Sequence, residues 1–139
     1  MSHAKVRNIF QSLLAEETKV GGSLEGMRLA YDNVKFVPKT NELYLALHLM
    51  PVDTFSDTLN ARDHTAILGL FQVKVIEGSA NATGVSDDVV AALNDIFIAD
   101  KVYGEEFKVQ IITPLKVSEG KAQDGRWSVP CYFEYRADT

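Results

Sequence analysis

The chain contains a single cysteine, Cys131, among its 139 residues. One cysteine excludes a disulfide within the chain and is typical of a reducing compartment. No apolar stretch reaches the ~18 residues that a membrane-spanning helix needs, and residues 1–7 lack the apolar core of a signal peptide. We therefore expect a soluble intracellular protein in which Cys131 is buried filler rather than a reactive thiol.

Positive charge is also scarce. The 14 Lys and Arg residues are outnumbered by 19 Asp and Glu, and the formal net charge is −5. Such a chain has no broad attraction for nucleic acid or for an anionic membrane. We therefore expect neither a specific nucleic acid nor a membrane among its partners. The length predicts a single domain over 1–139, because two smaller domains would each bury too little apolar surface.

Motifs for catalysis, cofactors and metals are missing as well. The glycines lack the spacing of a dinucleotide or phosphate loop, and the cysteine and histidines lack zinc-ligand spacing. His48 alternates with apolar residues, which indicates a hydrogen-bonded core or groove histidine. Asp63 and His64 have the residue types of an orienting carboxylate and an imidazole, but no nucleophile accompanies them. We predict no enzyme activity, no cofactor and no bound metal.

Two segments show the apolar spacing of amphipathic helices. The first lies near the N-terminus and is expected to stop before Gly21-Gly22. The second follows Ser86, a residue type that caps helices, and carries Asp87 and Asp88 in its first turn. The two stripes consist of Val6, Ile9, Phe10, Leu13 and Leu14, and of Val89, Leu93, Ile96 and Phe97.

Five segments are predicted to form strands. They are 27–36, 43–52, 64–78, 107–115 and 126–136. A hairpin turn at 37–42 is expected to join the first two, and Pro51 to end the second. The third would span about 13 residues, roughly twice the usual length, and so would brace the sheet at its centre. Within it, Gly69 indicates a bulge or a close backbone approach.

The last strand contains Pro130, which cannot donate to a ladder, so we expect an edge position or a bulge there. One face of this strand is predicted to be apolar. It carries Trp127, Val129, Cys131, Phe133 and Tyr135. Together the elements predict an α+β domain of two layers, a mostly antiparallel β-sheet with two helices packed on one face. The polar segments 53–63 and 118–125 are predicted loops, of the kind that often carries function.

Several segments occur in an order that resembles a known family. They are the opening helix around Ile9, Phe10 and Leu14, then Gly69-Leu-Phe-Gln-Val-Lys-Val75, Val90-Ala-Ala-Leu-Asn-Asp-Ile-Phe97, Phe107-Lys-Val-Gln-Ile-Ile-Thr-Pro114 and Asp124-Gly-Arg-Trp-Ser-Val-Pro-Cys-Tyr-Phe-Glu-Tyr-Arg136. In order, spacing and total length they resemble the tail-terminator, or tail-completion, proteins of tailed bacteriophages and prophages. The resemblance covers most of the chain and includes no chemically diagnostic residue.

The resemblance implies a structural, non-enzymatic role in virion assembly. Proteins of this family form a ring, typically a hexamer, that stops polymerisation of the tail tube and offers a surface to the head connector. The implied partners are sister copies, the tail-tube protein and the head–tail connector protein. The implied locations are the host cytoplasm during assembly and the tail of the virion. The contact candidates come from the two polar loops: Asp53, Phe55, Asp57, Arg62, Asp63, Glu119, Lys121, Asp124 and Arg126.

Two other interpretations remain open from the sequence. A small α+β cone of the nuclear-transport-factor-like type, an enzyme or a ligand-binding domain, would place His48, Asp63 or His64 with Tyr44 around a deep pocket. A sheet packed solid by apolar side chains would favour assembly instead; those side chains are Leu45, Phe71, Val73 and Phe133. The third interpretation is another head–tail connector or neck protein.

Overall fold

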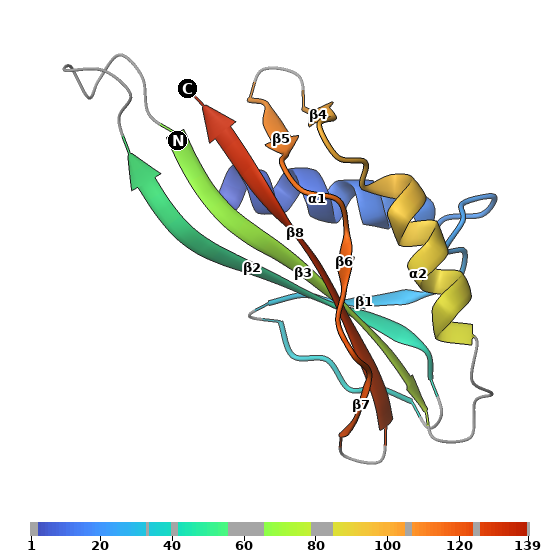
Figure 1. Cartoon of the computed structure of the whole chain (residues 1–139). Coiled ribbons are helices and arrows are strands. Elements are labelled where there is room, and N and C mark those ends of the chain that lie inside the picture. The colour runs from blue at the N-terminus through green and yellow to red at the C-terminus, as the bar shows by residue number, and fades with distance from the viewer. Residues whose placement is uncertain are drawn as a thin grey trace.

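The structure is a computed structural model that describes residues 3–32, 34–39, 42–55, 66–78, 85–104, 107–123 and 126–138, with the backbone alone at 53–55, 85, 86 and 123. The elements in chain order are α1 (His3–Glu17), β1 (Arg28–Ala30), β2 (Tyr44–Phe55), β3 (Ala66–Gly78), α2 (Val85–Ile96), β4 (Val102–Tyr103), β5 (Val109–Ile111), β6 (Lys116–Val117), β7 (Lys121–Gln123) and β8 (Arg126–Asp138). Figure 1 shows three long curved strands, β2, β3 and β8, crossing in front of α1, with α2 to their right.

The sheet is built around β3 and β8. Its strand order is β1-β2-β3-β8-β5-β4, with β6 and β7 also paired to β8. β3 pairs with β8 over 13 residues, from Ala66 opposite Asp138 to Gly78 opposite Arg126. On its other side β3 pairs with β2 along nearly the same length. The prediction that this long strand braces the centre of the sheet is therefore confirmed.

Both helices cover one face of the sheet with aromatic side chains. The ring of Phe10 on α1 lies 5.0 Å from that of Phe71 on β3 and 5.1 Å from that of Phe133 on β8. The ring of Phe97, just after α2, lies 4.8 Å from Phe133. All four side chains are buried, and each contributes about 1.5–3 kcal/mol from burial. The predicted α+β class, with helices on one side of a mostly antiparallel sheet, is confirmed.

The predicted hairpin at 37–42 is wrong. The strand expected over 27–36 is reduced to Arg28–Ala30, and it pairs with β2 in parallel, with Arg28 opposite Tyr44. Parallel pairing requires the chain to return to the level at which β1 began, so the intervening residues form a crossover and not a tight turn. The pairing stops at Ala30. Two residues later, the carboxylate of Asp32 accepts a hydrogen bond from the backbone N–H of Leu49 at 3.0 Å.

Pro51 does not end its strand. β2 continues to Phe55, and the register to β3 shifts between Pro51 and Asp53. Pro51 lies opposite Gly69. The N–H of Leu49, two residues earlier, points away from β3 to Asp32, so the nitrogen of Pro51 also faces away from β3. On that side β1 pairs only with residues 44–46, and the missing N–H of Pro51 therefore leaves no interior ladder bond unmade. Gly69 does mark a close approach, because a Cβ there would overlap the ring and hydroxyl of Tyr135.

Pro130 does not place β8 at an edge. β8 pairs with β3 on one side and with β5, β6 and β7 on the other. The carbonyl of Pro130 accepts a hydrogen bond from the N–H of Ser118, in the gap between β6 and β7. In a strand the N and O of one residue point to the same side, so the proline nitrogen faces this gap and β3 loses no donor.

Three short strands were not predicted: β4, β6 and β7. The expected strand 107–115 shrinks to Val109–Ile111, and the expected loop 118–125 contains β7. Gln123 lies opposite Arg126, and the sequence between them is Asp-Gly. This dipeptide is typical of hairpin turns. Trp127 was expected in the core but is 41% exposed, because it lies at the end of the sheet against Gly120.

Candidate assembly surfaces

The contact candidates from sequence are placed unevenly. Glu119 and Lys121 are exposed, as a contact role requires. The backbone of Asp53 and Phe55 belongs to the end of β2 rather than to a loop. Four further candidates lie outside the described residues: Asp57, Arg62, Asp63 and Asp124. His64 also lies outside them.

Arg126 has a structural role at the start of β8. Its guanidinium donates hydrogen bonds to the carbonyl oxygens of Lys39 at 2.8 Å and Glu42 at 3.1 Å. It also lies over the ring of Tyr44, 5.7 Å from the centroid. These contacts attach the crossover segment to the sheet, so Arg126 is less available to a neighbour than its position suggested.

A second arginine completes this attachment. Arg28 lies 4.4 Å from the ring centroid of Phe36 and pairs with Glu42 at 3.0 Å. The rings of Phe36 and Tyr44 are stacked 4.7 Å apart. Together with Arg126, these side chains form a stack in the order Arg28 guanidinium, Phe36 ring, Tyr44 ring and Arg126 guanidinium. This stack orders the segment 34–39 on the surface of the sheet. The sequence had predicted the end of a strand over 34–36 and a hairpin turn from 37 onwards.

On the helix-free face of the sheet, His48 forms the one histidine–carboxylate pair found among the described side chains. Its Nδ1 is 2.8 Å from Oδ1 of Asp32, and the His48 side chain is 52% exposed. The two line a shallow groove of about 340 Å³ with Lys74 and Gln72. The groove lacks Tyr44, the predicted neighbour of His48 in the cone interpretation. The histidine is hydrogen-bonded, as predicted, but it is not a core residue.

The region beneath the sheet is lined with buried apolar side chains. The side chains of Leu45, Phe71, Val73 and Phe133 are all fully buried. Close packing by these side chains favours assembly over a cone with a cavity. No group of three or more His, Cys, Asp or Glu side chains in the described part of the chain could hold a metal ion. Neither α1 nor α2 is long and apolar enough to cross a membrane.

A partly buried polar pair, His3 and Tyr135, lies at the start of α1. The hydroxyl of Tyr135 is 2.6 Å from Nδ1 of His3, and burial raises the pKa of Tyr135 to about 12. Burial, and then the positive charge of Arg7, lower the pKa of His3. Neutral imidazole and neutral phenol thus satisfy each other. The pair is inert in acid–base terms near neutral pH.

Glu77 is the buried carboxyl group at the other end of β3. Its side chain is 2% exposed, and burial followed by the charge of Asp87 raises its pKa. One of its oxygens has no hydrogen-bond partner among the described atoms. Asp87 belongs to the first turn of α2, where backbone N–H groups favour its negative charge. The two carboxyls therefore share an end of the sheet without forming a site with a third ligand.

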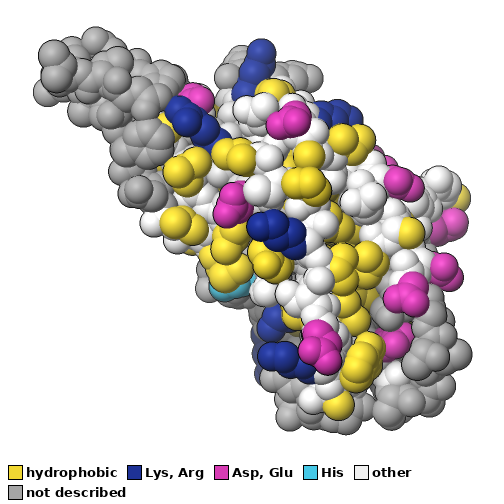
Figure 2. All heavy atoms as spheres, viewed as in Figure 1, with side chains coloured by type: hydrophobic (Ala, Val, Ile, Leu, Met, Phe, Trp, Pro, Cys, Tyr) yellow, Lys and Arg dark blue, Asp and Glu magenta, His cyan; other side chains and the backbone are white. Residues whose placement is uncertain are grey.

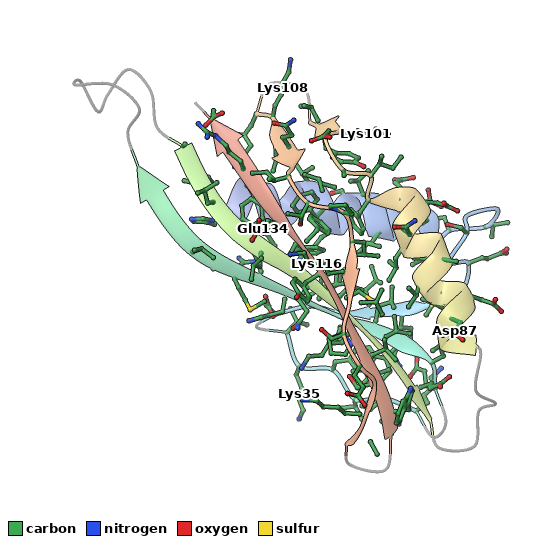
Figure 3. The ribbon with its side chains drawn as sticks, viewed as in Figure 1. Lys35, Asp87, Lys101, Lys108, Lys116 and Glu134 are labelled. Atoms are coloured by element: carbon green, nitrogen blue, oxygen red, sulfur yellow. The ribbon has the colours of Figure 1, made fainter. Side chains whose placement is uncertain are left out.

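The helix-free face of the sheet carries an open apolar groove. It measures about 420 Å³ and is lined by Val52, Leu68, Leu70, Ile112 and Glu134 among others. Figure 2 views this face and shows hydrophobic side chains interspersed with isolated charges. Figure 3 places Glu134 and Lys116 on β8 and β6 in the middle of the same view. Exposed apolar surface of this kind is typical of a protein that contacts other proteins.

These features define a class of protein. The fold is a solid α+β domain whose described surface offers exposed apolar grooves, short edge strands and separated charges. Such a surface suits assembly with other chains.

Comparison with known proteins identifies the family. The model of a family described as phage tail terminator protein matches residues 5–135. The chain therefore belongs to the phage tail terminator family, a structural and non-enzymatic family, and the resemblance inferred from sequence is confirmed. It is a phage tail structural protein, as its family is.

Solved structures show the same fold. Eleven of their chains match, and one of these is 26% identical with a TM-score of 0.79, covering 99% of this chain and 96% of the other. No curated protein matches this chain.

Proposed function

We propose that this protein is a ring-forming tail terminator of a phage or prophage. Copies of the chain assemble in the host cytoplasm into a ring, typically a hexamer, on the end of the growing tail tube. The ring stops further polymerisation and presents a surface to the head–tail connector protein. The family match over residues 5–135 carries this proposal. The solidly packed core supports it, because an assembly role needs a rigid surface and no internal cavity.

The proposal is tested with the tail-tube protein of the same phage or prophage. Light scattering coupled to size-exclusion chromatography gives the mass of the chain alone and after mixing with tube protein. Electron microscopy of tubes polymerised with and without the chain gives their lengths. We expect rings on tube ends and shorter tubes, since a capped end cannot add subunits.

The control is an equal amount of an unrelated protein of similar size and net charge, which should leave tube length unchanged. A chain that stays monomeric beside the tube protein and does not alter tube length would contradict the proposal. Binding to the connector protein without binding to the tube would assign the chain to another position in the neck.

A further inference from the structure

One flank of the molecule is an acidic helix surface. The outward face of α2 carries Asp87, Asp88 and Asp95, all exposed, and the helix has no Lys, Arg or His. Asp88 and Asp95 are seven residues apart, so they lie on the same side of the helix two turns apart. Near this face Ala91 is exposed and Ile98 is 47% exposed. The flank combines uncompensated negative charge with apolar surface.

A second surface has the opposite sign. The crossover segment 34–39 presents Lys35 and Lys39, both exposed, and neither ammonium group has a carboxylate partner among the described residues. Between them the segment exposes Val37, and just before them Val34, at 66% and 60%. The stack of arginines and rings beneath it fixes this segment on the sheet. It therefore combines positive charge with apolar surface in an ordered conformation.

The two surfaces lie on opposite flanks of one subunit. Figure 3 labels Asp87 on α2 at one side and Lys35 beyond the opposite edge of the sheet. In Figure 2 the acidic side chains gather along the α2 side, while dark blue side chains gather below β2. A contact between unlike surfaces on opposite flanks joins copies head to tail, and a head-to-tail contact that closes on itself gives a ring.

We infer that the ring contact is formed by the acidic face of α2 in one copy against the segment 34–39 in the next. This inference rests on the proposed ring function and names the surfaces that build it. The exposed valines and Ile98 form the apolar centre of the contact, and the lysines and aspartates form its charged rim. Rim charges mainly set partner orientation, so their arrangement selects head-to-tail pairing over other pairings.

Salt dependence gives the first test, on the full chain. A subunit with net charge −5 repels its copies, and salt would relieve that repulsion and strengthen a contact without charge pairing. Direct pairing between the two flanks predicts the opposite sign. We expect the association constant from sedimentation equilibrium to fall about tenfold between about 50 mM and about 500 mM NaCl. A constant that rises with salt would overturn the inference.

Charge reversal gives the second test. The variant Asp88→Lys/Asp95→Lys reverses the acidic flank; one change opposes and the other favours the helix dipole, so the helix keeps its stability. The variant Lys35→Glu/Lys39→Glu reverses the other flank. Each alone should lose self-association about tenfold or more, and an equal mixture should recover it, because every contact then pairs opposite charges. Circular dichroism confirms that both variants are folded.

A matched control changes the net charge by the same amount elsewhere. Lys108→Glu/Lys116→Glu equals the lysine-segment variant in charge change, and both positions lie away from the two flanks (Figure 3). It should associate like the unaltered chain. Oligomers that ignore both flank variants would overturn the assignment of surfaces while leaving a ring. A chain that never associates, even on tube ends, would overturn the ring itself. Loss of duplex-DNA binding with Lys35→Glu/Lys39→Glu, without loss of association, would reassign the basic segment to nucleic acid.

Discussion

At the scale of single residues, Gly69 shows how a local feature serves the packing of the core. A Cβ on Gly69 would overlap the ring of Tyr135, which is fully buried. We expect Gly69→Ala to lower the free energy of unfolding by about 1–3 kcal/mol, since a buried ring cannot move aside. Urea denaturation measures the change.

The control for this substitution is Gly120→Ala. A Cβ there would overlap the ring of Trp127, but that ring is 41% exposed and can shift into solvent. Its effect should stay within about 0.5 kcal/mol. Equal effects of the two substitutions would show that the close approach at Gly69 carries no special packing cost.

Cys131 is a second residue whose environment makes a measurable difference. Its side chain is fully buried, and burial raises the pKa of the thiol to about 11. At pH 8 the reactive thiolate is therefore rare as well as inaccessible. We expect no labelling of the native protein by a thiol reagent over hours, and stoichiometric labelling in concentrated urea. Labelling of the native protein at the rate seen in urea would contradict the predicted burial.

The same burial has a consequence at high pH. Cys131 and Tyr135 hold their protons more tightly in the folded chain than their ordinary pKa values of 9.0 and 10.0 allow, with folded values of about 11 and about 12. Stability from these groups is complete below pH 9 and is lost as the pH rises toward 12, because the unfolded chain releases its protons first. Each group contributes a slope of at most about 1.4 kcal/mol per pH unit in its window.

At the scale of elements, Asp32 follows β1 and supplies a hydrogen-bond acceptor at the edge of β2. Its carboxylate accepts the N–H of Leu49 and pairs with His48. We expect Asp32→Ala to lower the free energy of unfolding by about 1 kcal/mol, since a strand donor loses its partner. Amide hydrogen exchange at Leu49 should speed up in this variant, and less so in Asp32→Asn, which retains an acceptor. Unchanged protection at Leu49 would contradict this role.

The first helix depends on docking rather than on its own sequence. α1 has no acidic residue in its first turn and no basic residue in its last, so its termini gain nothing from the helix dipole. Phe10 contacts Phe71, Phe97 and Phe133. We expect Phe10→Ala to cost about 3–5 kcal/mol in urea denaturation, with Phe10→Leu in between. Ser12→Ala, on the exposed side of the same helix, should change stability by less than about 0.5 kcal/mol.

Elements also show where sequence reasoning fails. Long apolar strands and helix stripes are predictable because their period is written in consecutive residues, and β3, β8, α1 and α2 all conform. The direction of β1 is not, because a crossover and a hairpin of similar length read alike. The predictions that Pro51 ends its strand and that Pro130 marks an edge strand were wrong for a related reason. Whether a missing N–H matters depends on which side of the strand has a neighbour.

At the scale of the whole molecule, the continuous pairing of β2, β3 and β8 joins both ends of the sheet. The prediction of a single domain therefore has a thermodynamic test. The fluorescence of Trp127, at one end of the sheet, and far-UV circular dichroism should report one coincident unfolding midpoint. Two separated midpoints would show that the part near Trp127 unfolds independently.

The assembly surfaces, too, were only partly predictable from the sequence. The sequence directed attention to its two polar loops, and most of those candidates lie in segments outside the described residues or, like Arg126, are used within the subunit. Lys35 was assigned to a predicted strand and Lys39 to a predicted turn, and Asp87 and Asp88 were interpreted only as favourable charges in the first turn of α2. A list of charges shows their number but not the flank on which each lies.

The amino-acid sequence by itself determined the fold class and the family of this protein: an α+β fold with the segment order of the phage tail terminator family. Periodicity and composition are properties of the sequence itself, so they are visible without knowledge of the fold. Only the tertiary structure decided which strands are neighbours, which proline is harmless, and which charges lie on opposite flanks. Those facts depend on residues far apart in the chain being brought together, as Arg126 is with Lys39 across 87 positions.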